Sequence, residues 1–493
     1  MIDQKIKLIT GSLLHDIGKV VYREGSDRRN HSVSGYDFLK EEGKIEDKEI
    51  LDCVRYHHFS EIKSAHLKED NLAYIVYLAD NIAAFADRRK KEDTEEKGFD
   101  LSVPLQSVFN VLNGNNQSFY YQPGDMDDQG KINYPASEKK PFSREFYMKI
   151  CQRMLDNFRG MNWSEEYLNS LLAVMEANLS YMPSSTSNEE LSDISLFDHV
   201  KLTAAISSCI YDYLNENHLS YKTELFDKKD FYDRNAFLLC SMDISGIQSF
   251  IYTISSKNAL KNLRARSFYL EIMMEHIIDF LLDRLQLSRA NLLYSGGGHC
   301  YLLLANTTET VIQIQKFQEE LKEWLLKQFQ TDLFVAFGYV QCTGNAFRNV
   351  PEGSYTELFR KMSKMLSLQK QHRYTAREII RLNNRKEQDY SRECKVCKKI
   401  GHVDEEGVCP LCRKIEKLSK NVLYADFFSV ILENPDERED AMPLPGGYCL
   451  VADDEKKLCR RMENDDYFVR AYSKNKLYTG KHIATKLWVG DYS

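Results

Sequence analysis

The chain has 493 residues, of which 43% are hydrophobic and 28% charged, and its formal net charge is -7. A chain of this length is expected to form about two to four domains. The acidic total excludes a protein that coats nucleic acid indiscriminately, although a local basic groove is compatible with it. The sequence has no run of about 18 apolar residues, which is the length needed to span a bilayer. The first residues also lack a signal-peptide pattern. These features predict a cytoplasmic protein without a membrane partner.

Residues 1–220 have the pattern of one α-helical domain. Short apolar stretches recur with polar residues between them, as at residues 72–79, and strand signals are few. Near the start, residues 13–19 read Leu-Leu-His-Asp-Ile-Gly-Lys. The adjacent His15 and Asp16 place an imidazole and a carboxylate at one point, where both can bind the same divalent metal.

Further histidines and aspartates follow this pair at separate places in the helical domain. Imidazole and carboxylate groups suit divalent transition metals such as Mn²⁺, Co²⁺ or Ni²⁺, and a helical domain gathers such ligands in its interior. A single histidine is more often a surface residue, so the prediction rests on the whole set. The predicted metal ligands are His15, Asp16, His31, His57, His58 and Asp80.

Hydrolysis of a phosphodiester is the chemistry expected at such a centre. One or two metal ions lower the pKa of a bound water and stabilise the charge that builds on the phosphate oxygens. Lys19 lies one turn beyond His15 and would add a positive charge near the substrate, so the predicted catalytic residues are His15, Asp16 and Lys19. His199 follows Asp198 in another helical stretch, and it is either a further ligand or an ordinary helix residue.

After residue 227 the pattern changes to short strands and long amphipathic helices. Apolar residues spaced by three or four predict one helix over 270–285 and another over 314–324. Their order with the strands is β-α-β-β-α-β, which predicts a ferredoxin-like domain over residues 228–350. The runs that predict strands lie at residues 237–242, 292–294, 301–304 and 333–340.

Nucleotidyl cyclase and polymerase palm domains share this order and hold two metals with acidic residues. Here the first strand keeps Asp243, but the hairpin turn is Gly-Gly-Gly-His and offers no acid, so this palm is predicted to be catalytically silent. Glycines still let backbone N–H groups approach a phosphate, which makes Asp243, Gly297 and Gly298 candidate nucleotide-binding residues with ATP as a possible ligand. A tight hairpin explains the glycines equally well.

Four cysteines form the most specific motif of the chain. Cys394 and Cys397 are separated by two residues, and so are Cys409 and Cys412. This spacing predicts a tetrahedral structural Zn²⁺ within a helical, polar linker domain of residues 351–423, whereas four free thiols would be exposed and reactive. The remaining residues, 424–493, are predicted to be rich in strands.

The order of the histidines and aspartates resembles that of the HD phosphohydrolase superfamily. The whole chain resembles the large signature subunit of type III CRISPR effector complexes, and it is most similar to subtype III-A. The predicted fold class is therefore multidomain α and α+β, with a helical HD domain, a ferredoxin-like palm and a zinc-binding helical insertion. The motifs that carry the resemblance are residues 13–19, Asp-Ile-Ser-Gly-Ile-Gln-Ser-Phe at 243–250, Ser-Gly-Gly-Gly-His at 295–299 and Lys-Leu-Trp-Val-Gly at 486–490.

The resemblance implies an RNA-guided antiviral complex in which this chain joins other effector subunits, CRISPR RNA and target RNA. It implies metal-dependent cleavage of single-stranded DNA by the HD domain, and synthesis of cyclic oligoadenylate from ATP by a second palm with a Gly-Gly-Asp-Asp motif. The sequence contains no such motif, so the chain is expected to be an N-terminal portion in which residues 424–493 lead to the missing palm. Two alternatives stay open: a non-catalytic scaffold with a structural metal, and a stand-alone HD phosphohydrolase acting on nucleotides.

Overall fold

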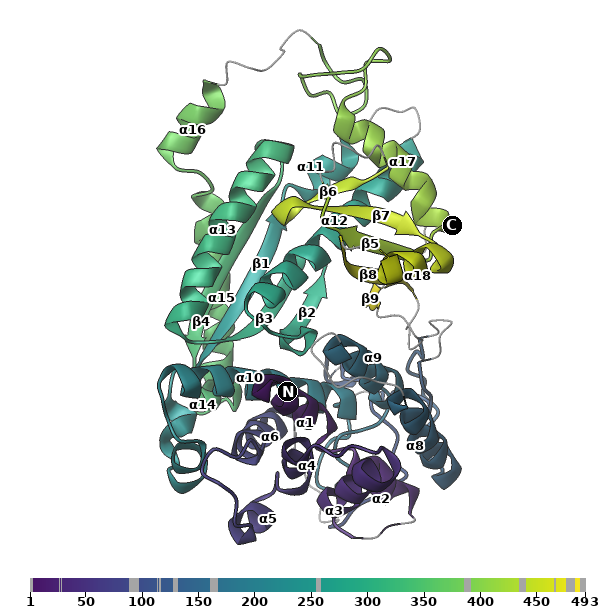
Figure 1. The fold of residues 1–493 in the computed structure, drawn as a ribbon, viewed down its shortest axis with the longest axis vertical. Helices are drawn as coiled ribbons and strands as arrows, with labels where there is room; N and C mark the ends of the chain where they lie inside the picture. The colour runs from purple at the N-terminus through teal and green to yellow at the C-terminus, as the bar shows by residue number, and fades with distance from the viewer. Residues whose placement is uncertain are drawn as a thin grey trace.

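The computed structural model arranges the chain as a helical unit, a four-stranded central sheet and a second sheet of five strands (Figure 1). Residues 488–490 of the last motif lie outside the described residues. None of the described helices is long and apolar enough to cross a membrane. The described residues are 3–25, 27, 29–87, 97–112, 114, 117–126, 132–159, 167–253, 259–384, 392–433, 440–464, 467–475 and 484–487.

The helical unit occupies one end of the molecule and contains the N-terminus (Figure 1). Local signals set its helix ends: the side chain of Asp3 accepts a hydrogen bond from the backbone of Lys5 at the start of α1, and Ser195 caps α10 in the same way. Its helices are α1 (Gln4–Leu14), α2 (Gly18–Glu24), α3 (His31–Asp37), η1 (Phe38–Glu42), α4 (Lys48–Arg55), α5 (Phe59–Ser64), α6 (Ala73–Asp87), α7 (Phe109–Leu112), α8 (Arg144–Phe158), α9 (Leu168–Leu179) and α10 (Leu196–Glu216).

Gly18 permits the close packing of α2 against α3. A Cβ atom at this position would lie 1.8 Å from the carbonyl oxygen of His31 and 2.7 Å from the backbone nitrogen of Gly35. Both neighbours are backbone atoms that cannot rotate away, so only glycine fits. The glycine of the Leu-Leu-His-Asp-Ile-Gly-Lys motif therefore brings His31 towards Asp16.

The central sheet has the predicted β-α-β-β-α-β order. Its four strands are antiparallel and lie in the order β2-β3-β1-β4, which is the ferredoxin-like arrangement. Two short helices, η3 (Thr223–Asp227) and η4 (Asp230–Asp233), precede it, and η5 (Arg289–Asn291) precedes its second strand. Its elements are β1 (Phe237–Ser245), α11 (Ile247–Tyr252), α12 (Ala259–Arg284), β2 (Leu292–Gly296), β3 (His299–Ala305), α13 (Thr308–Phe329) and β4 (Phe334–Cys342).

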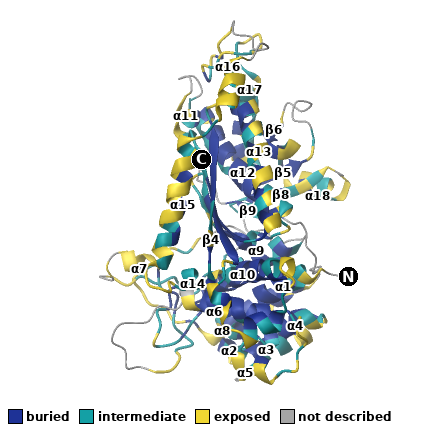
Figure 2. Cartoon of the chain, turned by 90° about the vertical axis from the view of Figure 1, so that its left-hand side faces the viewer, coloured by how far each residue is buried: buried dark blue, intermediate teal, exposed yellow. Residues whose placement is uncertain are grey.

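Both faces of this sheet are buried, and alternate residues of β1 face opposite sides. Leu238 and Cys240 join a core with α12 and α13, whereas Phe237 and Leu239 join a core with α6 and α10 of the helical unit. Figure 2 shows this buried layer running through the centre of the molecule. The helical unit and the palm thus share one hydrophobic core.

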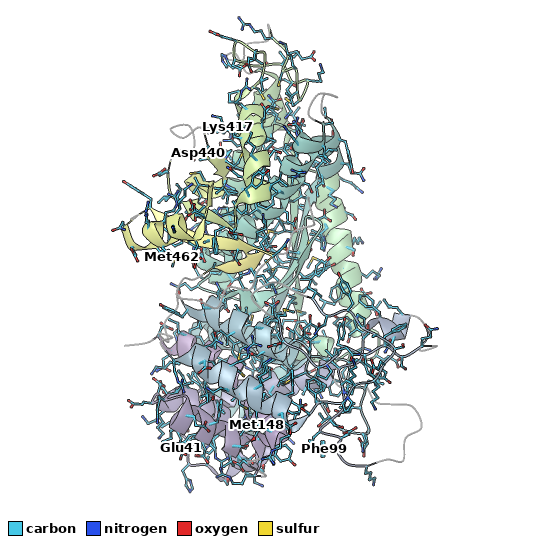
Figure 3. All side chains as sticks on the ribbon, turned by 90° about the vertical axis from the view of Figure 1, so that its right-hand side faces the viewer. Glu41, Phe99, Met148, Lys417, Asp440 and Met462 are labelled. Atoms are coloured by element: carbon cyan, nitrogen blue, oxygen red, sulfur yellow. The ribbon has the colours of Figure 1, made fainter. Side chains whose placement is uncertain are left out.

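The rest of the chain forms a helical linker and a second sheet in the order β6-β7-β5-β8-β9. Phe428 and Val430 of this sheet pack into the same core as α12 and α17. Figure 3 shows from another side that Lys417 and Met462 lie by this sheet, far from Met148 of the helical unit. The elements are α14 (Gly344–Phe347), α15 (Ser354–Gln371), α16 (Ala376–Asn383), α17 (Pro410–Tyr424), β5 (Phe427–Ile431), β6 (Met442–Leu444), η7 (Pro445–Gly447), β7 (Tyr448–Asp453), α18 (Glu455–Asn464), β8 (Phe468–Lys474) and β9 (Thr485–Leu487).

Candidate metal centres

The helical unit gathers its predicted ligands into one cluster. The C-terminal end of α1 supplies a histidine and an aspartate, and α3, α6 and the connection between α4 and α5 supply the others. A further histidine arrives from the first turn of α10. Apart from two half-buried histidines, every member is buried. The cluster comprises His15, Asp16, His31, His57, His58, Asp80 and His199.

Two groups of three side chains in this cluster have the proximity that a metal ion needs. Within each group the potential ligand atoms all lie within 4.8 Å of one another. In the first group, Nε2 of His199 lies 3.1 Å from Oδ1 of Asp80, and Nε2 of His15 lies 3.7 Å from the same oxygen. The second group consists of His31, His57 and His58.

Asp16 lies between the two groups. Its Oδ1 is 3.3 Å from Nε2 of His31 and 3.7 Å from Nε2 of His57. Its Oδ2 is 3.2 Å from Nε2 of His199 and 3.6 Å from Nε2 of His15. One carboxylate oxygen thus faces each group, and this geometry fits two metal ions with Asp16 between them.

Lys19 contacts the same carboxylate. Its Nζ lies 2.5 Å from Oδ2 of Asp16, because the two residues are one helical turn apart. The lysine therefore forms an ion pair inside the cluster. The contact between Lys19 and substrate that the sequence predicts stays a prediction.

The protonation states suit metal binding. Burial alone would raise the pKa of Asp16, but the charge of Lys19 and the contacts with the neighbouring histidines hold it well below its usual value. Burial, together with the neighbouring His58, lowers the pKa of His57 well below its ordinary range. Charged carboxylates and neutral imidazoles are the forms that coordinate metals.

The orientation of the imidazoles also fits a metal. Nδ1–H of His15 donates to the carbonyl of Ser12 at 2.7 Å, and Nδ1–H of His57 donates to the carbonyl of Val54 at 2.7 Å. Each backbone contact directs Nε2 into the cluster, as second hydrogen bonds of metal-binding histidines do. Nε2 of His15 is buried and has no hydrogen-bond partner among the described residues. A metal ion bound to this nitrogen would satisfy it. The donor set therefore fits a divalent transition metal.

Acidification should destabilise the metal-free protein. Burial and the neighbouring His31 lower the pKa of His58 from 6.5 to about 4. Since the unfolded chain binds the proton first, the stability linked to His58 is complete above pH 6.5 and is lost as the pH falls through about 4. We expect Tm in EDTA to fall across this window, and to fall less in His58→Gln. A Tm that is equally pH-dependent in both proteins would contradict this assignment.

The palm residues predicted to bind nucleotide lie at one end of the sheet. Oδ2 of Asp243 is 3.1 Å from Nδ1 of His299 and 2.9 Å from Nζ of Lys370 on α15. Gly297 and Gly298 have positive φ angles of 61° and 79°, which the tight turn requires. The only acid of the predicted palm set is thus in an ion pair with Lys370 and in contact with the ring of His299. Nucleotide binding by Asp243, Gly297 and Gly298 stays a prediction.

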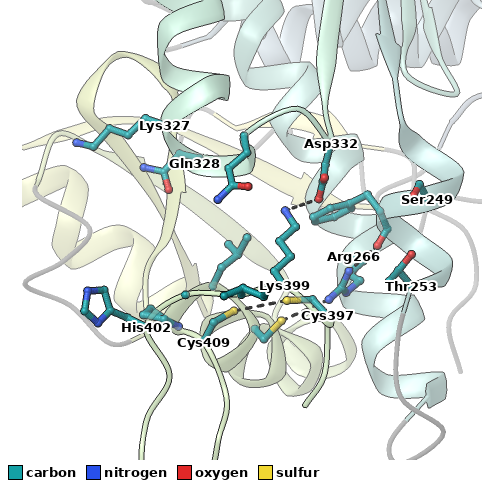
Figure 4. A pocket seen from close by; sticks show the side chains of 17 residues that line it. Ser249, Thr253, Arg266, Lys327, Gln328, Asp332, Cys397, Lys399, His402 and Cys409 are labelled. Carbon is teal, nitrogen blue, oxygen red and sulfur yellow. Dashed lines mark hydrogen bonds and ion pairs between the residues drawn. The ribbon is translucent and has the colours of Figure 1, made fainter. Parts of the chain in front are cut away.

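The four cysteines meet between the linker and the palm (Figure 4). Their sulfur atoms lie within 4.8 Å of one another, and the Sγ atoms of Cys397 and Cys409 are 3.8 Å apart. The backbone N–H of Cys409 donates to Sγ of Cys394 at 3.3 Å. Pro410 then starts α17, where its missing N–H costs nothing. Four thiolates in this arrangement fit a structural Zn²⁺.

Arg266 of α12 connects this cysteine cluster to the palm. Its guanidinium donates to Sγ of Cys412 at 3.4 Å and to the carbonyl of Phe250 at 2.5 Å, and it is 3% exposed. Figure 4 shows Arg266 beside the cysteines, with Lys399 and its ion-pair partner Asp332 nearby. A cation at this place offsets the negative charge that four thiolates leave on zinc.

Removal of this guanidinium should weaken zinc binding. We expect Arg266→Met to release zinc to a chelator about 10-fold faster than the parent, because outer partners of a metal site contribute about 10- to 100-fold to affinity. A metallochromic dye measures the release. Arg264→Met on the same helix is the matched control. Equal release rates for Arg266→Met and the parent would show that the guanidinium does not support the site.

Sequence reasoning left His199 undecided and did not identify Arg266. A signal for His199 existed, because Ser195 caps α10 and fixes which residues of its first turn face inward. No local signal marks Arg266, which lies far from Cys412 in the chain and meets it only through the packing of α12 against α17.

Two family models match the chain: the HD domain over residues 1–84 and the Csm1 subunit domain B over residues 236–385. A relative from Enterococcus italicus, named CRISPR system single-strand-specific deoxyribonuclease Cas10/Csm1 of subtype III-A, is 41% identical over 99% of this chain. A relative of the same name from Streptococcus thermophilus is 39% identical over 99% of this chain. The chain is a homologue of the Cas10/Csm1 proteins of subtype III-A.

The chain spans 66% and 64% of the lengths of these two Cas10/Csm1 relatives. Solved Csm1 structures share its fold over 98% of the chain. The apo Csm1–Csm4 cassette matches with a TM-score of 0.70 at 24% identity and is covered to 59%. The Csm1–Csm4 subcomplex of the type III-A CRISPR–Csm interference complex matches with a TM-score of 0.68 at 23% identity and is covered to 60%. The predicted fold class and the resemblance to subtype III-A are confirmed.

Proposed function

We propose that this chain is the nuclease-bearing part of a Csm1 subunit and that its HD centre cuts single-stranded DNA in a metal-dependent reaction. The observation that carries the proposal is the buried cluster in which Asp16 faces one ligand group with each carboxylate oxygen. Relatives at 39–41% identity are named single-strand-specific deoxyribonucleases, which indicates the substrate.

The residues have separable roles in this proposal. His15, Asp80 and His199 would hold one ion, the three histidines of the second group another, and Asp16 both. Bound divalent ions, with Mn²⁺, Co²⁺ or Ni²⁺ as candidates, supply Lewis acidity that lowers the pKa of water and stabilises charge on the phosphate. Lys19 holds Asp16 ionised and in place. Backbone carbonyls hold His15 and His57 in the tautomer that exposes Nε2.

A nuclease assay with three substrates tests the proposal and its two alternatives. We expect the purified chain to cut single-stranded DNA with Mn²⁺, Co²⁺ or Ni²⁺, to leave duplex DNA intact, and to be inactive in EDTA. Bound metal without turnover on any substrate would favour the scaffold. Hydrolysis of mononucleotides in preference to DNA would favour the stand-alone phosphohydrolase. Metal analysis of the same samples makes these outcomes distinct.

The same homology supports a proposal for the assembly. We place the chain in the cytoplasm within an RNA-guided antiviral complex that contains CRISPR RNA, target RNA and other effector subunits, among them a Csm4-like subunit, since the solved neighbours are Csm1–Csm4 structures. Synthesis of cyclic oligoadenylate from ATP is proposed only for a full-length protein with a Gly-Gly-Asp-Asp palm, because residues 1–493 contain no such motif. The four cysteines hold a structural Zn²⁺ in this proposal.

A further inference from the structure

A cavity of about 480 Å³ lies beside the HD centre. Lys19 and His31 belong to both, so whatever fills the cavity lies next to the metal ligands. Its volume is in the range of pockets that bind small organic groups. One part of its wall is formed by α2 and the start of α3, and a second part by Phe99, Leu101 and residues 184–187.

An exposed aromatic ring stands on the second part of the wall. Phe99 is 75% exposed, although its backbone is held in place. It pairs with Ser187 as an isolated antiparallel bridge, and its neighbours Gly98 and Asp100 form backbone hydrogen bonds of 2.9 Å with Asn188 and Thr186. The ring is therefore presented to the solvent from a fixed backbone.

A buried arginine fixes this wall relative to the HD centre. The guanidinium of Arg23 donates to the carbonyl of Pro183 at 2.8 Å and to that of Ser184 at 3.3 Å. Arg23 lies on α2, the helix that also carries Lys19. The distance between the aromatic wall and the metal ligands is thus set by one rigid helix.

The charged groups of the cavity already have partners within the protein. Lys19 pairs with Asp16, and Arg29 pairs with Asp27 and Asp37. Glu190 also lines the cavity, and its carboxylate accepts a hydrogen bond of 2.5 Å from the hydroxyl of Ser185. The surface that remains for a ligand is mainly aromatic and hydroxyl-bearing, from Tyr22, Phe99 and the hydroxyl residues 184, 186 and 187. A nucleobase has the complementary chemistry, because its π face stacks on aromatic rings and its edge forms hydrogen bonds.

We propose that this cavity seats one unpaired nucleobase of the DNA strand being cut, with Phe99 as its stacking platform. A base in a duplex is stacked and paired and cannot enter, so the cavity selects single-stranded DNA next to the phosphodiester that reaches the HD centre. This inference rests on the proposed nuclease function, and it assigns to Phe99 a role in substrate specificity rather than in the chemical step.

Binding measurements in EDTA test the base site without relying on cleavage. The probes are a short single-stranded oligothymidylate and an abasic strand of the same length, both with a fluorescent end label for anisotropy. We expect Phe99→Ala to weaken binding of the oligothymidylate about 5- to 100-fold, as the loss of one aromatic stacking platform does. Phe99→Tyr should retain the affinity. The abasic strand should bind the parent and Phe99→Ala equally.

The control is Phe109→Ala, because Phe109 is 57% exposed but does not line the cavity. The base site is refuted if Phe99→Ala binds the oligothymidylate as the parent does, or if it loses affinity equally for the abasic strand. A parent protein that shows the expected binding pattern but cuts no DNA in Mn²⁺ refutes the nuclease and leaves the base site standing. Thermal melting of each variant verifies that it is folded.

Discussion

Replacing His15 and Asp16 together by alanine should abolish the metal-dependent cleavage of single-stranded DNA. We expect the rate to fall by at least about 100-fold, since even outer partners of a metal site contribute about 10- to 100-fold and these residues are proposed direct ligands. Asp16→Ala alone should cause most of this loss, because Asp16 faces both ligand groups. Rates are measured on end-labelled DNA in Mn²⁺.

Metal analysis distinguishes this explanation from simple misfolding. His199→Ala should lower the bound metal by one ion, and Asp16→Ala should lower it by two, because the carboxylate of Asp16 contacts both groups. His66→Ala is the control, since His66 belongs to neither group. A double variant that cuts DNA as fast as the parent would assign the activity to another site or to a contaminant.

Replacing Cys409 by serine should cost the protein its zinc and much of its stability. Structural zinc in small domains contributes an apparent binding free energy of about 10 to 16 kcal/mol, so we expect a loss of at least about 3 kcal/mol in the free energy of unfolding. The effect should extend beyond the linker, because Cys409 is the N-cap residue of α17, and α17 contributes Ile415 and Leu418 to the core of the palm. Zinc content and Tm measure the loss.

Cys459→Ser is the matched control, because Cys459 is half-buried and lies outside the cysteine cluster. It should retain one zinc and the Tm of the parent. If Cys409→Ser also retains its zinc and the Tm of the parent, the cysteines do not hold a structural metal. The contact between Arg266 and Cys412 would then not support a zinc site.

The fold class could be predicted because its signals are local. Apolar runs separated by amphipathic helices give the β-α-β-β-α-β order, and the antiparallel sheet confirms it. The metal cluster was predictable in composition for a similar reason, since His15 and Asp16 are adjacent and His57 and His58 are adjacent.

The geometry of the sites was not predictable, because it depends on contacts between distant segments. No pattern around Asp16 indicates that its two oxygens face different groups, which follows from the packing of α3 and α10 on either side. The palm gives a second example. The contact between Asp243 and Lys370 joins the first strand to α15, which lies more than a hundred residues later, and no local pattern indicates it.

The core shared by the helical unit and the palm has a practical consequence. Phe237 and Leu239 of the sheet share a core with Ile206 of α10 and with residues of α6. Removing either domain would expose the apolar residues that the other contributes to this core. Deletion of residues 1–220 would therefore leave an aggregation-prone palm rather than a nuclease-free subunit. The proposed nuclease activity of this protein therefore has to be removed by point substitution and not by deletion of a domain, because the HD unit and the palm fold around a shared core.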